Sequence, residues 1–186
     1  MMHRREAVKK LLANRGRLLV VAGLGSTAWD CTAAGDSPLT FPLWGAMGQA
    51  VMMGLGLALA QPRRRVLVIT GDGEMLMGLG SLATIGVQKP ANLSVVVIDN
   101  ERYGETGMQA THTASGIDLA GVARSCGLNI FDFKNHRAAI HEQPGPNFAV
   151  VKVVAEKIPL VLPPREGALL KARFRRALLG PEADLA

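Results

Sequence analysis

The chain is poor in cysteine and in aromatic residues. Two of its 186 residues are cysteines, and aromatic residues make up 4% of the total. Cys31 and Cys126 do not have the spacing of a metal-binding set, and two cysteines in a chain of this size do not form a disulfide framework. This usage is typical of a reducing compartment, so we expect a cytoplasmic protein. It also leaves no cysteine set for an iron–sulfur cluster.

The chain also lacks a long apolar run. The most apolar segment, residues 45–60, falls short of the roughly 20 residues that a membrane-spanning helix needs. Residues 1–17 are basic and precede the apolar residues 18–25. This pattern superficially resembles a signal peptide. The apolar part is very short, and we interpret residues 18–22 as the first strand. We therefore expect no membrane partner.

Positive charge exceeds negative charge, with a formal net charge of +6. Residues 63–65 are three consecutive arginines, and residues 171–176 belong to a predicted C-terminal helix with an apolar face of Leu169, Leu170, Phe174 and Leu178. The one aromatic residue among these charges, Phe174, belongs to the apolar face, and no nucleic-acid-binding module is recognisable. We interpret them as solvated surface and expect no nucleic-acid partner.

What the chain has in quantity is aliphatic side chains and glycine. Hydrophobic residues make up 48% of it, so valine, leucine, alanine and methionine must fill the core. No internal repeat or low-complexity segment is evident. The length favours one domain over residues 1–186.

Two apolar, β-branched runs each end in a polar residue. Residues 66–69 precede Asp72, and residues 94–98 precede Asn100, 28 positions further on. Such runs are typical of buried parallel strands, and residues 75–86 are long enough for a crossover helix between them. Parallel strands end at the same sheet edge, which is where ligands bind in open α/β sheets. The sequence therefore predicts an α/β fold, a three-layer α/β/α sandwich with a mainly parallel sheet.

The residues at this edge suit magnesium and a phosphate. Asp and Asn oxygens are hard ligands of the kind that Mg²⁺ takes together with phosphates and water. Gly71 and Gly73 have no side chains, so a bulky anion can approach the backbone of Asp72. Residues 74–77 would open a helix whose first amides favour negative charge. By itself the tripeptide could mark only a turn.

The whole pattern, Gly-Asp-Gly followed by a crossover helix and an apolar strand ending in Asn, resembles the diphosphate-and-magnesium motif of thiamine diphosphate (ThDP) enzymes. The resemblance implies metal ligation by the side chains of Asp72 and Asn100 and by the carbonyl of Arg102. It covers roughly residues 3–155. It further assigns cofactor contacts to the following residues: Gly25, Ser26, Thr27, Gly45, Met47, Gly71, Asp72, Gly73, Glu74, Asn100, Tyr103 and Gly104.

Within that set the resemblance distinguishes the two ends of the cofactor. Residues 25–27 resemble the loop that donates to the diphosphate. Gly45 would offer its carbonyl to the aminopyrimidine, and Met47 would be the large apolar residue that forces the cofactor into a V shape. Without the nearby motif, Met47 would be ordinary core filler.

Within the superfamily, the chain most resembles the β subunits of sulfopyruvate decarboxylases and the matching half of phosphonopyruvate decarboxylases. The residues that carry this likeness are 71–73, 80–86, 98–100, 103–109, 113–123 and 126–127. It implies a 2-oxoacid decarboxylase subunit that binds ThDP and Mg²⁺. A carboligase or 2-oxoacid oxidoreductase subunit, and a non-catalytic interaction subunit, are the alternatives.

The resemblance also implies a partner. In the family, a glutamate that hydrogen-bonds the pyrimidine ring comes from a second, pyrimidine-binding domain, and this chain has room for only the diphosphate-binding one. We therefore expect a separate pyrimidine-binding α subunit and a hetero-oligomer. Residues 45–60 should lie near the subunit boundary.

Two residues are candidates for proton transfer: Glu105 and His112. Related decarboxylases carry a glutamate close to this place, but it aligns nearer to Thr106. His112 could contact a substrate anion or be a surface residue. Glu74 stands where the family has a small residue, so its carboxylate must turn away from a diphosphate or pair with Arg102 or a partner residue.

Overall fold

A six-stranded parallel sheet forms the centre of the computed structural model, which describes residues 1–133 and 143–184. The strand order is β2-β1-β3-β4-β8-β7, and every pairing in this sheet is parallel. The strands are β1 (Leu19–Ala22), β2 (Thr40–Pro42), β3 (Val66–Gly71), β4 (Leu93–Asp99), β7 (Asn129–Ile130) and β8 (Asn147–Lys152).

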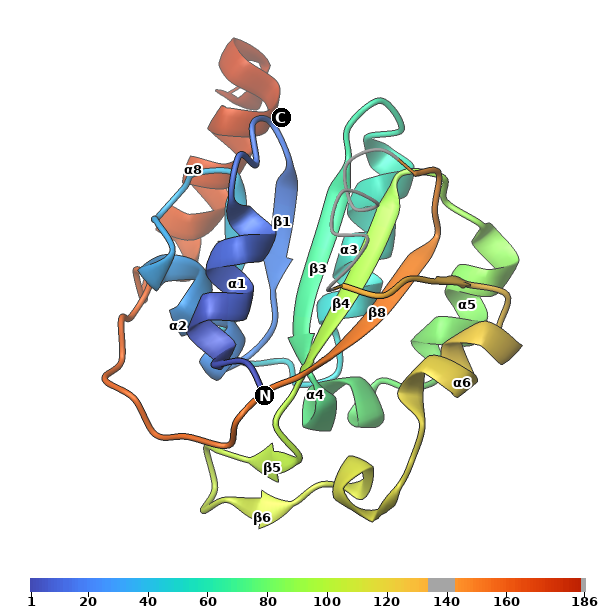
Figure 1. The fold of residues 1–186 in the computed structure, drawn as a ribbon. Coiled ribbons are helices and arrows are strands. Elements are labelled where there is room, and N and C mark those ends of the chain that lie inside the picture. Colours follow the sequence, from blue (N-terminus) through green and yellow to red (C-terminus); the bar gives the residue numbers. More distant parts are fainter. Residues whose placement is uncertain (134–142, 185–186) are drawn as a thin grey trace.

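Helices cover both faces of the sheet (Figure 1). One face carries α1 (Arg4–Leu12) and α2 (Ser26–Ala33). The other face carries α3 (Ala50–Ala60), α5 (Ser81–Gln88), α6 (Leu119–Ser125) and α8 (Gly167–Leu179). At the carboxyl ends of the strands lie α4 (Asp72–Met77), the hairpin of β5 (Arg102–Tyr103) and β6 (Gln109–Ala110), and the short helix η1 (His112–Ser115). A second short helix, η2 (Gly180–Asp184), follows α8.

Alternation along the strands divides the core into two layers. In β3, Leu67 and Ile69 pack toward α1 and α2, whereas Val66 and Val68 pack toward α3. Since successive side chains of a strand point to opposite faces, one fully apolar strand supplies both layers. The expected three-layer sandwich with a parallel sheet is thus confirmed.

The expected crossover helix between β3 and β4 is two helices, α4 and α5. The break coincides with Gly78, the C-cap of α4, whose backbone lies against the carbonyl of Gly48. A Cβ at this position would overlap that carbonyl oxygen, so the close approach requires glycine. The contact brings the loop that carries Met47 next to α4.

The C-terminal helix differs from expectation in one residue. Leu170 and Phe174 of α8 are buried, and Leu178 packs against the same core. Leu169 was expected on this face, but it is 54% exposed. Leu170 and Phe174 are four positions apart and so share one face of the helix. Leu169 comes one position before Leu170, so its side chain points away from that face.

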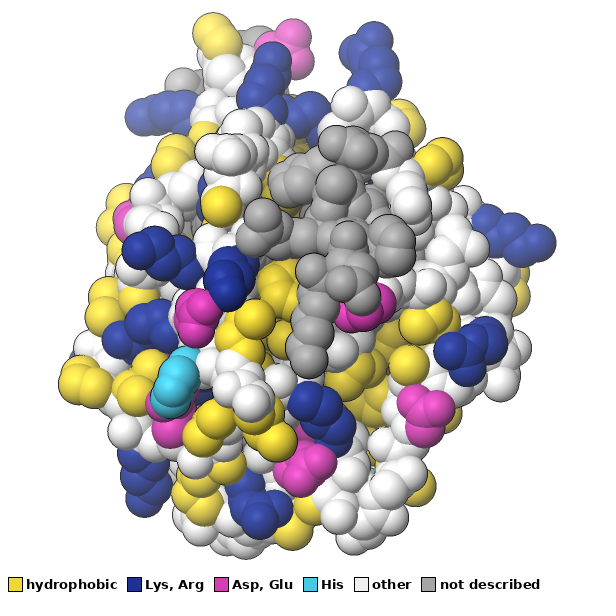
Figure 2. All heavy atoms as spheres, in the orientation of Figure 1, with side chains coloured by type: hydrophobic (Ala, Val, Ile, Leu, Met, Phe, Trp, Pro, Cys, Tyr) yellow, Lys and Arg dark blue, Asp and Glu magenta, His cyan; other side chains and the backbone are white. Residues whose placement is uncertain are grey.

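Charge is dispersed over the surface. Figure 2 shows Lys and Arg side chains scattered over one face, with Asp and Glu among them. Within residues 1–133 and 143–184, no helix is both long enough and apolar enough to cross a membrane.

Two glycines of α3 provide a test of how this helix packs on the sheet. A Cβ at Gly54 would overlap the side chain of Val68, whereas a Cβ at Gly56 would meet nothing within 4 Å. We expect Gly56→Ala to raise the free energy of unfolding by about 0.5–1 kcal/mol, and Gly54→Ala to lower it by about 1–3 kcal/mol. Urea denaturation measures both. Equal stability of the two variants would contradict the contact between α3 and β3.

Candidate functional site

A cavity of about 280 Å³ opens at the carboxyl ends of the strands. It is bounded by the loop after β1, the loop before α3, the start of α4 and the segment after β4. Most of the predicted site residues line it: Ser26, Thr27, Met47, Gly71, Asp72, Gly73, Glu74, Asn100, Arg102, Tyr103, Gly104 and Glu105. Three predicted residues, Gly25, Gly45 and His112, are not part of the lining.

Asp72 is a buried carboxylate at the first position of α4, with 2% of its surface exposed. Its Oδ2 accepts hydrogen bonds from Thr111 Oγ1 at 2.6 Å and from Thr113 Oγ1 at 3.1 Å. Burial raises the pKa of this carboxyl, with a smaller contribution from the charge of Asp99. Among the described residues, no lysine or arginine forms an ion pair with it. A buried carboxylate without a cationic partner fits a metal ligand.

A polar network supports Asp72 from the end of β4. Thr113 Oγ1 also donates to Asp99 Oδ1 at 2.9 Å, and Asp99 Oδ2 lies 2.8 Å from Lys152 Nζ. Lys152 contacts Glu101 Oε1 at 2.6 Å as well. Lys152 is therefore the cationic partner of Asp99, and the Thr113 hydroxyl links Asp99 to Asp72.

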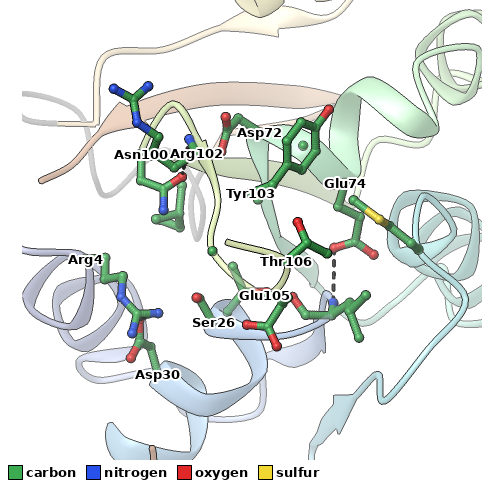
Figure 3. A pocket seen from close by; sticks show the side chains of 17 residues that line it. Arg4, Ser26, Asp30, Asp72, Glu74, Asn100, Arg102, Tyr103, Glu105 and Thr106 are labelled. Atoms are coloured by element: carbon green, nitrogen blue, oxygen red, sulfur yellow. Dashed lines mark hydrogen bonds and ion pairs between the residues drawn. The ribbon is translucent and has the colours of Figure 1, made fainter. Parts of the chain in front are cut away.

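Asn100 and Arg102 form a tight turn directly after β4. The Asn100 Oδ1 atom accepts a hydrogen bond from the Arg102 amide at 3.0 Å, and Glu101 between them has φ 60°. Asn100 and Arg102 are thereby held at the cavity edge beside Asp72 (Figure 3). No cluster of three His, Cys, Asp or Glu side chains capable of metal binding occurs in residues 1–133 and 143–184. Any metal held here by one carboxylate, one amide and one carbonyl needs further oxygens from a ligand.

The two glycines that flank Asp72 have different surroundings. A Cβ at Gly71 would meet nothing within 4 Å, so the backbone is open to an approaching group. A Cβ at Gly73 would overlap the ring of Tyr103. The absence of a side chain at Gly73 therefore allows the aromatic ring to pack on the start of α4.

Glu74 turns toward the loop after β1. Its Oε2 accepts hydrogen bonds from the Leu24 amide at 3.1 Å and from Thr70 Oγ1 at 2.8 Å (Figure 3). Burial raises the pKa of its carboxyl. A Cβ at Gly23 would overlap the carboxylate, so the contact requires glycine there. Glu74 thus ties the loop after β1 to the Gly-Asp-Gly segment, and it does not pair with Arg102.

The loop after β1 turns sharply at Gly25, which has φ 74° and precedes the first residue of α2, Ser26. The carboxyl group of Glu105 lies over this turn, since a Cβ at Gly25 would be 3.0 Å from Glu105 Oε1. Burial raises the pKa of the Glu105 carboxyl, against a smaller lowering by the charge of Arg4. Of the two proton-transfer candidates, Glu105 lines the cavity, whereas His112 is exposed on η1.

Sequence reasoning missed several residues that shape this site: Arg4, Asp30, Thr111 and Thr113. Arg4 and Asp30 come from α1 and α2, and nothing in the sequence pairs them. Thr111 and Thr113 do fall in or next to the stretch 113–123 that carries the family likeness, but their partner Asp72 is 39 positions upstream of Thr111.

The fold and the motif geometry define the class of protein. The family model described as thiamine pyrophosphate enzyme, C-terminal TPP binding domain, matches residues 25–153. Thiamine pyrophosphate is another name for ThDP. The chain belongs to this family, as its resemblance implied.

The relatives indicate which members of this family the chain is similar to. The chain is 42% identical to the sulfopyruvate decarboxylase subunit beta of Methanothermobacter thermautotrophicus over 82% of its own length and 83% of the relative's. It is 35% identical to the subunit of the same name from Methanocaldococcus jannaschii, over 93% and 95% of the two chains. The solved structure of benzoylformate decarboxylase from Polynucleobacter necessarius superposes with a TM-score of 0.71 at 20% identity, over 84% of this chain and 34% of that one. This last likeness shows the fold.

Proposed function

We propose that this chain is the ThDP- and Mg²⁺-binding subunit of a two-subunit 2-oxoacid decarboxylase, whose active site is shared with a separate pyrimidine-binding subunit. The observation that carries the proposal is the convergence of Asp72, Asn100 and Arg102 on one cavity edge. The similarity to subunits named sulfopyruvate decarboxylase beta over most of both chains supports the reaction and the existence of a partner.

The donor set fits the proposed cofactor and metal. The carboxylate of Asp72, the amide oxygen of Asn100 and the carbonyl of Arg102 would hold Mg²⁺, with diphosphate oxygens completing its shell. The open backbone at Gly71 leaves room for the diphosphate itself, and Ser26 begins α2 at the cavity. When bound, the thiazolium of ThDP would accept the electron pair released as a 2-oxoacid loses carbon dioxide.

The chain's own residues contribute position and proton control. Thr111 and Thr113 orient the Asp72 carboxylate by hydrogen bonds, and Glu74 orients the loop after β1. Met47 lines the cavity from the loop that also carries Gly45 and Gly48, where an apolar side chain can support the bend between the two cofactor rings. Glu105 is the proton-transfer candidate that lines the cavity, and burial raises the pKa of its carboxyl.

Turnover of a 2-oxoacid panel tests the reaction. The chain is combined with a pyrimidine-binding partner subunit, and release of carbon dioxide is measured from 3-sulfopyruvate, phosphonopyruvate and pyruvate. We expect release from at least one of them that depends on both subunits and on Mg²⁺. Binding of ThDP without carbon dioxide release from any substrate would contradict the decarboxylase assignment. A condensed hydroxyketo acid as product would instead support a carboligase.

A further inference from the structure

Arg4 is a buried cation at the cavity, from a part of the chain that the family match does not include. Its side chain lines the cavity with 3% of the residue exposed. It lies on α1, whereas the family match begins at residue 25. Arginine is almost never fully buried unless it is paired. The partners of Arg4 therefore determine what it can do.

The pairing of Arg4 is incomplete. Its Nη1 lies 3.1 Å from Asp30 Oδ2, but Asp30 is shared, because Arg5 Nε donates to its Oδ1 at 3.0 Å. One carboxylate thus faces two guanidinium groups. Among the described residues, Nε and Nη1 of Arg4 have no acceptor in hydrogen-bonding geometry. This corner of the cavity therefore holds a buried guanidinium with unused N–H donors, a feature that favours an anion.

The position of Arg4 identifies which part of a ligand it would meet. In Figure 3, Arg4 and Asp30 lie on the side of the cavity where Ser26 and Asn100 are found, and Glu74 lies on the opposite side. Ser26 begins α2, and Asn100 belongs to the proposed metal-binding set. Arg4 therefore lies toward the metal end of the cavity and away from the Glu74 end.

A carboxylate of the chain shares this part of the cavity. The Glu105 side chain lies over Gly25, and the charge of Arg4 acts on it. Residues 104–107 are exposed, so Glu105 can turn outward into solvent when another anion enters. The guanidinium fork of Arg4 matches the paired oxygens of a phosphate, which a lysine at this position would meet only as a point charge.

We propose that Arg4 is a binding residue for the diphosphate end of the cofactor, at the metal end of the cavity. The proposal rests on the proposed function, since the ligand is the diphosphate of ThDP. It assigns a cofactor contact to α1, and it gives the unused N–H donors of Arg4 a role in binding.

Titration of the purified chain with inorganic diphosphate and Mg²⁺, followed by calorimetry, tests the contact. Arg4→Gln should weaken binding by about 10- to 100-fold, which corresponds to one lost charge-assisted interaction. Arg5→Gln is the matched control, because it removes a guanidinium from the same carboxylate without touching the cavity lining. It should change the affinity by less than about 3-fold. If Arg4→Gln binds Mg²⁺–diphosphate as tightly as the wild-type chain does, the proposal for Arg4 is overturned and the proposed function is unaffected.

Two further measurements distinguish a lost contact from a damaged fold. In the reconstituted pair, Arg4→Gln should weaken binding of ThDP but not binding of thiamine, which lacks phosphates. Equal weakening of both would overturn the contact.

If Arg4→Gln does not fold, the variant Arg4→Lys tests the contact instead. Its binding of Mg²⁺–diphosphate should be about 5- to 10-fold weaker, because lysine lacks the guanidinium fork. Unchanged affinity would overturn the contact. A wild-type chain that binds neither Mg²⁺–diphosphate nor, with its partner, ThDP overturns both the proposed function and this proposal.

Discussion

Replacement of Asp72 by alanine is expected to abolish Mg²⁺-dependent ThDP binding while the chain remains folded. The variant removes the single carboxylate of the proposed metal set, which is buried and has no lysine or arginine partner among the described residues. Removal of one member of a buried charge pair costs about 3–5 kcal/mol, so the affinity should fall by at least about 100-fold. Calorimetry with ThDP and Mg²⁺ on the reconstituted pair measures the loss.

The melting temperature of a second variant, Asp72→Asn, separates an effect on ligand binding from an effect on folding. Since burial raises the pKa of the Asp72 carboxyl, its charged form costs folding free energy above that pKa in the metal-free chain. Asp72→Asn removes this cost and keeps a hydrogen-bond acceptor for Thr111 and Thr113. We expect its melting temperature without metal at pH 7 to equal or exceed that of the wild type. The difference should shrink as the pH falls and Asp72 takes up a proton.

Asn100→Ala is the graded comparison for this prediction. It should weaken binding in the same direction but less, because a neutral ligand is lost. Near-normal cofactor affinity in Asp72→Ala would mean that the metal site is misassigned. Loss of folding in both Asp72 variants would mean that the carboxylate has a structural role, contrary to the expectation from its raised pKa.

The parts of the fold that could be predicted are those encoded by local pattern. The three predicted apolar runs, which become β1, β3 and β4, are uninterrupted and rich in valine and isoleucine, which is what strands buried on both faces require. Their carboxyl ends carry the Gly-Asp-Gly segment and Asn100, so the edge of the site followed from the strand positions. The break between α4 and α5 did not, because it depends on contact with Gly48, which is 30 positions from Gly78.

The parts of the site that were missed depend on contacts distant in the sequence. The basic residues at the N-terminus look like a solvated or targeting segment, and only the packing of α1 on α2 buries Arg4 against Asp30. Glu74 was recognised as unusual, yet its partner could not be known, since the Leu24 amide is 50 positions away. The glycine at position 23 is the sequence signal for that contact, but its meaning follows only from the structure.

The purified chain alone is expected to be catalytically silent and to bind ThDP poorly. The residues assigned to this chain would hold the metal and the diphosphate, so the pyrimidine end of the cofactor would lack its pocket and the activating glutamate expected from the partner. Turnover should be undetectable for the chain alone and should appear when the pyrimidine-binding subunit is added. Assay of carbon dioxide release, together with ThDP occupancy measured by calorimetry, checks both statements.

The boundary with that partner is expected along α3 and the loop before it. Met47 lines the cavity, and the neighbouring side chains of Met52, Met53 and Leu59 are 36%, 40% and 51% exposed. Exposed apolar side chains on a helix that follows a cavity-lining loop favour an interaction surface there. Met53→Glu should therefore weaken assembly and lower turnover at limiting partner concentration, whereas Val87→Glu on α5, where the wild-type residue is 78% exposed, should not.

Size-exclusion chromatography with the activity assay decides between a shared and a self-contained site. We expect the two subunits to elute together as an assembly with at least two copies of each, and the isolated chain to form homo-oligomers that cover the apolar surface of α3. Excess partner should recover the activity of Met53→Glu, because that variant leaves the cavity lining unchanged. An active monomer of this chain with full ThDP occupancy would overturn the shared site, because every group needed for the reaction would then lie within these 186 residues.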